Sequence, residues 1–208
     1  KEGDRAPIKK NFINGSLFSI SEGSIADFNG IAFAGQDLIN TAGPLFSVNN
    51  SHVYFDNCGF SGNANTNGTG AGLYVTGSKS NVYVQNCGYQ TLTAHKGGAA
   101  YIAGGECIFD NTSITTCTAC ADMIEGKGGS GGGIYIAGGD VNLSNSTAIT
   151  ACTAQDASGN GGFGGAVYVG AEGALGNLYL DGATIGNAMT PNTAQKGGGV
   201  YVAGGGKI

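Results

Sequence analysis

The chain has 208 residues, of which 41 are glycine, three are proline and 11% are charged. The formal net charge of −5, with a single arginine, excludes the clustered basic side chains that nucleic-acid binding requires. The glycines follow no three-residue period, which excludes collagen, and no apolar run approaches the roughly 18 residues of a membrane span.

Residues 1–14 are polar and rich in charge, and we interpret them as an N-terminal cap or the end of a preceding coil. Residues 15–208 carry one repeating pattern and are interpreted as a single repeat domain. Because the sequence stops a few residues into a repeat, we interpret the chain as a fragment of a longer protein.

A glycine-rich turn and a short strand with two inward apolar residues recur along the chain. The first apolar residues of successive copies are 28, 27, 27, 34, 33 and 33 residues apart. They are Phe18, Phe46, Leu73, Ala100, Ile134, Val167 and Val200. Self-similarity at a period of about 20 to 50 residues is typical of stacked repeats.

Each repeat continues with a second alternating strand, such as Val53-x-Phe55-x-Asn57, and a third short segment, such as Ile114-x-x-Cys117. Alternation of period two places the apolar residues on one face of a strand. Three short strands per repeat predict an all-β fold. We predict a right-handed, single-stranded parallel β-helix, a solenoid of about seven coils of 27–34 residues.

An asparagine closes the second strand in five repeats, 11, 11, 13, 11 and 11 residues after the first apolar residue. These residues are Asn29, Asn57, Asn86, Asn111 and Asn145. We expect their side chains to be buried in one column as a structural ladder, each amide bonded to the next coil, as in other stacked parallel strands.

The six cysteines do not follow the spacing of a zinc site, because Cys117-x-x-Cys120 is an isolated pair and both histidines are distant. The repeat accounts for most of them. Cys58 and Cys87 each follow a ladder asparagine, and Cys117 and Cys152 share a position in adjacent coils. We expect each pair to stack, either as a disulfide or as free thiols.

A column of tyrosines alternates out of phase with the inward apolar residues and should face outward. Its members are Tyr74, Tyr101, Tyr135, Tyr168 and Tyr201. The favoured interpretation is that stacked rings stabilise pairing between coils. The alternative is a binding stripe for sugar or protein. Long connections after the third segment form a second candidate contact edge.

Catalysis requires titratable groups that converge in a cleft. Asp56 and Asp110 belong to non-adjacent coils. Arg5 is remote from both, and His52 and His95 lie in different contexts. We therefore predict no catalytic residue, no metal site and no cofactor, and a protein that is not an enzyme.

The Gly-Gly segments and a Phe-x-x-Asn motif resemble the polymorphic outer membrane protein repeats of chlamydial surface autotransporters and related bacterial adhesins. The matching segments are Gly98-Ala99-Ala100, Gly132-Gly133-Ile134, Gly165-Ala166-Val167, Gly198-Gly199-Val200 and Phe60-x-x-Asn63. Later coils carry Ile-x-x-Cys in place of Phe-x-x-Asn. The resemblance implies a secreted passenger domain at the cell surface that mediates adhesion, associated with the outer membrane if the source is bacterial.

The leading functional hypothesis is a non-catalytic repeat domain, surface-exposed or secreted, that contacts a host-cell or matrix protein or a glycan. One alternative is a β-helix protein that binds or cleaves polysaccharide. Another is a purely structural repeat of an extracellular filament or wall.

Overall fold

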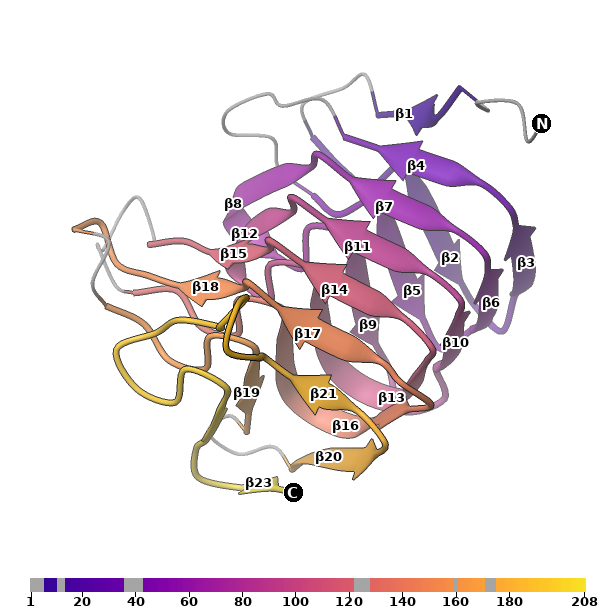
Figure 1. Ribbon diagram of the computed structural model, residues 1–208. Coiled ribbons are helices and arrows are strands. Elements are labelled where there is room, and N and C mark those ends of the chain that lie inside the picture. The colour runs from indigo at the N-terminus through magenta and orange to yellow at the C-terminus, as the bar shows by residue number, and fades with distance from the viewer. Residues whose placement is uncertain (1–5, 11–13, 36–42, 122–127, 159–160, 171–174) are drawn as a thin grey trace.

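The structure is a computed structural model that describes residues 6–10, 14–35, 43–121, 128–158, 161–170 and 175–208. Every regular element in these ranges is a β-strand, and the paired strands run parallel. The 23 strands of these ranges form three sheets around one apolar core (Figure 1).

One sheet has seven strands, in the order β1-β4-β7-β11-β14-β17-β21. They are β1 (Ile8–Lys9), β4 (Ala32–Ala34), β7 (Gly59–Ser61), β11 (Gly88–Gln90), β14 (Ser113–Thr115), β17 (Ala148–Thr150) and β21 (Thr184–Ile185). A second sheet has four strands, in the order β18-β15-β12-β8. They are β8 (Ala64–Thr69), β12 (Thr93–Lys96), β15 (Thr118–Ala119) and β18 (Thr153–Ala154).

The third sheet has twelve strands, seven of them in the order β2-β5-β9-β13-β10-β6-β3. They are β2 (Phe18–Ser21), β3 (Ile25–Asn29), β5 (Phe46–Asn49), β6 (His52–Asp56), β9 (Leu73–Thr76), β10 (Asn81–Gln85) and β13 (Ala100–Asp110). The other five extend the sheet beyond β13. They are β16 (Ile134–Ser144), β19 (Val167–Val169), β20 (Gly176–Asp181), β22 (Val200–Val202) and β23 (Gly206–Lys207).

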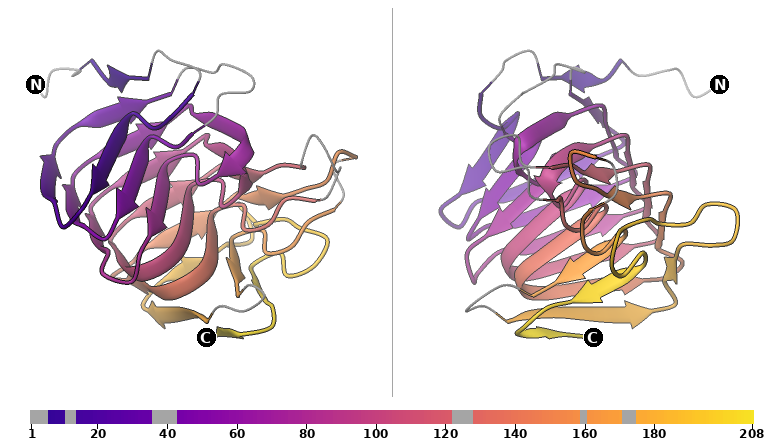
Figure 2. Two further views of the ribbon diagram at one scale, coloured as in Figure 1. Left: turned by 180° about the vertical axis from the view of Figure 1, so that it is seen from behind. Right: turned by 90° about the vertical axis from the view of Figure 1, so that its left-hand side faces the viewer.

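The predicted fold class, a right-handed single-stranded parallel β-helix, is wrong. The parallel strands belong to separate sheets of seven, twelve and four strands, and the largest closes most of the way round the core (Figures 1 and 2). In two repeats the expected first and second strands are one continuous strand, β13 or β16, of 11 residues each. Gly105 and Gly139, with φ of +76° and +81°, bend these two strands, and the pairing between the strands shifts register between Ile102 and Glu106.

The predicted register between repeats is confirmed at the first strand. Each first apolar residue pairs with its counterpart in the next repeat, from Phe18 with Phe46 at one end to Val167 with Val200 at the other. The alternation of the second strand is also confirmed, since in β6 and β10 the second and fourth residues are buried. Sequence spacing therefore predicts which residues are neighbours, although it does not predict how the strands are divided among the three sheets.

A cluster of phenylalanine rings fills the N-terminal part of the core. The ring of Phe46 lies at its centre, and five other ring centroids lie 4.7–5.7 Å away. These rings belong to Phe18, Phe28, Phe33, Phe55 and Phe60. Toward the C-terminus smaller aliphatic residues continue the core, for example Ile102, Ile134 and Val167. Edge-to-face aromatic pairs stabilise such a core beyond the burial of apolar area.

The asparagines predicted as a buried ladder are exposed, so the prediction of burial is wrong. They are Asn29, Asn57, Asn86, Asn111 and Asn145. The last four occupy bends with φ between +46° and +53°, which asparagine tolerates better than most residues. The pattern therefore marks a backbone conformation, and burial is not needed to explain it.

Hydrogen bonds between repeats are nevertheless present among these side chains. Asn111 Nδ2 donates to Asn86 Oδ1 at 2.8 Å, and Asn86 Nδ2 donates to Asp56 Oδ1 at 2.9 Å. Asn29 pairs in the sheet with Asp56, one position before the bend that Gly30 occupies in its repeat. Asn29 is thus one residue out of register with the other four.

The buried ladder lies one residue beyond the bend and consists of Cys58, Cys87, Thr112 and Thr147. We call it the thiol–hydroxyl ladder. The N–H of Cys58 donates to Cys87 Sγ at 3.3 Å, and that of Cys87 donates to Thr112 Oγ1 at 3.4 Å. The N–H of Thr112 donates to Thr147 Oγ1 at 3.1 Å, which itself donates to Phe109 O at 2.9 Å. The ladder therefore satisfies backbone groups at the bends that would otherwise be buried without partners.

Replacing Thr112 by valine is expected to lower the free energy of unfolding by about 1–3 kcal/mol. Valine has the shape of threonine, but it cannot accept the bond from the Cys87 N–H or donate to Val84 O at 3.1 Å. The Thr112→Ser variant keeps both bonds and is the control. Denaturant-induced unfolding measures the difference, and equal stability of the two variants would contradict the role of the ladder.

Candidate functional site

The longest strands carry an ordered polar surface on their outward side. Because alternate residues of β6, β10, β13, β16 and β20 point into the core, the residues between them point outward. In-register pairing aligns the outward residues in three columns, which we call the columnar face. The columns are Ile25, His52, Asn81, Glu106, Asp140 and Asn177; Asp27, Tyr54, Tyr83, Ile108, Asn142 and Tyr179; and Asn29, Asp56, Gln85, Asp110, Ser144 and Asp181.

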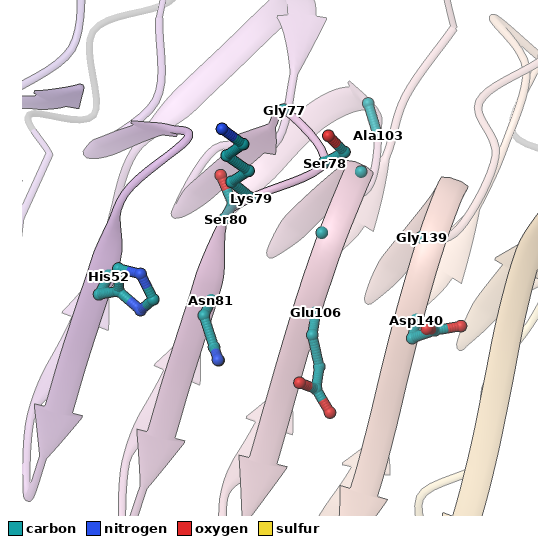
Figure 3. A pocket seen from close by; sticks show the side chains of 12 residues that line it. His52, Gly77, Ser78, Lys79, Ser80, Asn81, Ala103, Glu106, Gly139 and Asp140 are labelled. Atoms are coloured by element: carbon teal, nitrogen blue, oxygen red, sulfur yellow. The ribbon is translucent and has the colours of Figure 1, made fainter. Parts of the chain in front are cut away.

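An open groove of about 640 Å³ crosses the start of the columnar face (Figure 3). Its lining includes Gly77 in the turn before β10, Gly104 and Gly105 within β13, and Gly139 within β16. Four titratable side chains also line it: His52, Lys79, Glu106 and Asp140. Figure 3 shows Glu106 and Asp140 on the neighbouring strands β13 and β16, His52 on β6 with β10 between it and Glu106, and Lys79 on the turn before β10.

Close approach of backbones explains the glycines in the groove. A Cβ on Gly139 would lie 2.8 Å from the carbonyl carbon of Gly104, and a Cβ on Gly105 would lie 2.9 Å from Ser80 Cβ. Both glycines also have positive φ, which other residues rarely adopt. Part of the groove is therefore bare backbone, which a ligand can approach closely.

The carboxylates of the described chain are concentrated on the columnar face. Six of its eight described carboxylates belong to the three columns: Asp27, Asp56, Glu106, Asp110, Asp140 and Asp181. The other two are Glu22 and Asp156. Lys79 stands beside the groove, and Lys207 continues the first column by pairing with Asn177. Within the part of the chain that the structure describes, the face is therefore strongly acidic.

Amide side chains donate hydrogen bonds to several of these carboxylates. The donor–acceptor pairs are Asn29–Asp56 at 3.0 Å, Asn86–Asp56 at 2.9 Å, Gln85–Asp110 at 3.1 Å and Asn177–Asp140 at 2.7 Å. Two other oxygens of the face, Asn81 Oδ1 and Asn142 Oδ1, are shielded from solvent and accept no hydrogen bond from the described residues. The face thus has an excess of acceptors, because these amide donors are already engaged.

The predicted tyrosine column forms one continuous stack. Successive ring centroids are 4.5–5.5 Å apart, with interplanar angles of 7–27°. The stack contains Tyr74, Tyr101, Tyr135, Tyr168 and Tyr201. Burial raises the pKa of Tyr135, and Lys96 Nζ lies 5.5 Å from the centroid of its ring. Because the rings cover one another's faces, the stack favours stabilisation of the sheet over a sugar-binding stripe.

The predicted neighbours among the cysteines are reduced thiols, and they occupy equivalent positions of adjacent repeats. A hydrogen bond with Cys87 lowers the pKa of Cys58 to about 7, and the same bond raises the pKa of Cys87. Burial raises the pKa of Cys117, and a hydrogen bond with Cys117 lowers the pKa of Cys152. All four are buried, so their role is in the core.

The sequence patterns do not single out Glu106, Asp140 or Lys79 as site residues. A signal is nevertheless present, since His52, Glu106 and Asp140 each stand one residue before the first inward residue of the second strand. Aligning the outward positions of that strand across repeats would have found the column. Lys79 belongs to the extended turn between Val75 and Val82, which is shorter in most other repeats.

Comparison with known proteins finds no match among family models, curated proteins or solved structures. Among the described residues, no helix has the length and apolar character needed to cross a membrane. No group of three or more histidine, cysteine, aspartate or glutamate residues in the same ranges is arranged to hold a metal ion.

Proposed function

We propose that this chain is a non-catalytic binding domain of a surface-exposed or secreted protein, and that it mediates adhesion through the columnar face. One observation carries the proposal: outward hydrogen-bonding and aromatic side chains recur in register on six consecutive parallel strands. Neighbouring strands lie about 4.8 Å apart, so an extended partner meets similar contacts repeatedly. Such a surface gains affinity from many weak contacts acting together.

The partner of this proposal is a host-cell or matrix protein or a glycan. The resemblance of the Gly-Gly and Phe-x-x-Asn motifs to polymorphic outer membrane protein repeats supports the same function and a location at the cell surface. Exposed aromatic side chains give the face an apolar centre, because Tyr54 and Tyr83 are 43% and 37% exposed. Their rings stack at 5.4 Å and so form one broad surface.

Cleavage of a polysaccharide is the second candidate function. Glu106 and Asp140 are register partners at the groove, and most glycoside hydrolases use a pair of carboxylates. Binding is favoured because Asp140 already accepts a hydrogen bond from Asn177 and the groove is open to water. Turnover of a polysaccharide by the wild-type chain that is abolished in a Glu106→Gln variant would replace binding by catalysis.

The adhesion experiment compares two variants on immobilised protein. The Tyr54→Ser/Tyr83→Ser variant is expected to bind cells, matrix proteins or arrayed glycans about tenfold more weakly than the wild type, since exposed aromatic residues dominate contact energies. Gln90→Ser, an exposed position on the seven-stranded sheet, is the control and should bind normally. Equal binding by both variants and the wild type would contradict the proposal.

A further inference from the structure

The columnar face is negatively charged as well as regular. Six carboxylates lie on it, and the cations that approach it among the described residues stand only at its margins, at Lys79 and Lys207. Other described lysines lie elsewhere, with Lys96 over the tyrosine stack and Lys196 over Phe163. Among the described residues the negative charges are thus concentrated on the columnar face, which repels anionic partners.

The columnar face also offers more hydrogen-bond acceptors than available donors. The side-chain amides of Gln85, Asn86 and Asn177 already donate to carboxylates of the face, so these donors are engaged before a partner binds. A partner that fits must therefore supply N–H or O–H donors rather than acceptors. Lysine and arginine supply only donors together with a positive charge, whereas a neutral sugar hydroxyl both donates and accepts.

The spacing of the carboxylates fits an extended chain. Asp56, Asp110 and Asp181 lie on alternate strands of the third column, separated by Gln85 and Ser144. Two strand spacings amount to about 9.6 Å. A peptide in the extended polyproline II conformation advances about 3.1 Å per residue with three residues per turn, so every third side chain lies on one face and would reach the next carboxylate.

From these observations we propose that the columnar face docks a positively charged protein segment in the extended polyproline II conformation, with lysine or arginine at about every third position. The basic side chains lie against the third-column carboxylates, and their aliphatic stems cover Tyr54 and Tyr83. The groove residues Glu106 and Asp140 receive a further basic group. This inference rests on the proposed function and names the chemistry of its partner.

The test uses a fluorescent peptide with lysine at every third position, separated by serine and glycine. Its binding to the whole chain is measured by fluorescence anisotropy at about 20 mM and about 500 mM salt. The Asp110→Asn/Asp181→Asn variant is expected to bind about tenfold more weakly at low salt, and binding should largely disappear at high salt. Asparagine keeps the size and an acceptor oxygen of each side chain, and thermal unfolding confirms that the variant is folded.

The matched control removes the two described carboxylates outside the face. The Glu22→Gln/Asp156→Asn variant has the same change in net charge, and we expect it to lose less than about twofold in affinity. Equal weakening of the two double variants would overturn the inference, because the peptide would then respond to net charge alone. Binding of a neutral oligosaccharide that persists at high salt and is lost in Asp110→Asn/Asp181→Asn would also overturn it.

The two proposals fail in different ways. If the peptide does not bind while Tyr54→Ser/Tyr83→Ser still reduces adhesion, the face binds another kind of partner and only the inference about its charge is overturned. If the peptide does not bind and this variant adheres like the wild type, the proposed function is overturned as well.

Discussion

The Phe46→Ala variant is expected to lose about 3–5 kcal/mol of unfolding free energy. Truncation removes the ring that contacts five other phenylalanine rings, and it leaves a cavity where two repeats meet. The neighbouring rings cannot fill the cavity without leaving their stacked or edge-to-face positions. Denaturant-induced unfolding followed by circular dichroism measures the loss.

Phe163→Ala is the control for this experiment. Phe163 is only partly buried, and its ring contacts Tyr201 at a centroid distance of 5.0 Å. Its truncation should cost about 1 kcal/mol or less, since it leaves no enclosed cavity. Similar losses for the two variants would show that the ring cluster does not dominate the core.

The register of the repeats was predictable because it depends on the spacing of apolar residues alone. The joining of the first and second strands of a repeat into one continuous strand was not predictable, because it depends on the conformation of the connection between them within the largest sheet. Between β9 and β10 the turn at Gly77 contains additional residues, and the two strands remain separate. At Gly104 and Gly105 the connection is shorter, and the chain passes through as the single strand β13, whereas the equally short connection between β5 and β6 leaves those strands separate. A strict pattern of three strands per repeat overlooks this difference.

The asparagine pattern shows how one residue type can satisfy two different explanations. A buried amide ladder and a left-handed bend both predict asparagine at the same place in each repeat. In the structure four of the five asparagines occupy left-handed bends, and the buried thiol–hydroxyl ladder follows directly after the bends. Cys58 and Cys87 were recognisable as neighbours, but Thr112 and Thr147 were not, because a thiol and a hydroxyl look unrelated in sequence although they make the same bonds.

The columnar face was hidden for a related reason. Its first column contains His52, Asn81, Glu106 and Asp140, which differ in charge and size and so produce no visible motif. Only the register of the strands shows that they are neighbours. Asp56 and Asp110, which the sequence places in non-adjacent coils, lie in one column with Gln85 between them.

The two glycines of each Gly-Gly pair have different structural roles. The first, such as Gly131 with φ of +67°, adopts a left-handed conformation that disfavours other residues. The second, such as Gly132, has no such φ, but backbone atoms approach it closely. A Cβ on Gly132 would clash with Gly165 O and would lie 2.6 Å from the backbone N and O of Thr153. Backbone atoms cannot yield as a flexible side chain can, so the position tolerates only glycine.

Replacing Gly132 by alanine is therefore expected to cost about 3 kcal/mol or more and to separate β16 from the neighbouring repeat. Gly88→Ala is the matched control, because Gly88 lies inside β11 with an ordinary φ, and a Cβ added there would meet no atom within 4 Å. That variant should be unchanged or stabilised by up to about 1 kcal/mol, since alanine restricts the unfolded chain. Thermal unfolding of both variants provides the comparison. If they unfold at the same temperature, close backbone approach is not the reason for the second glycine of the pair.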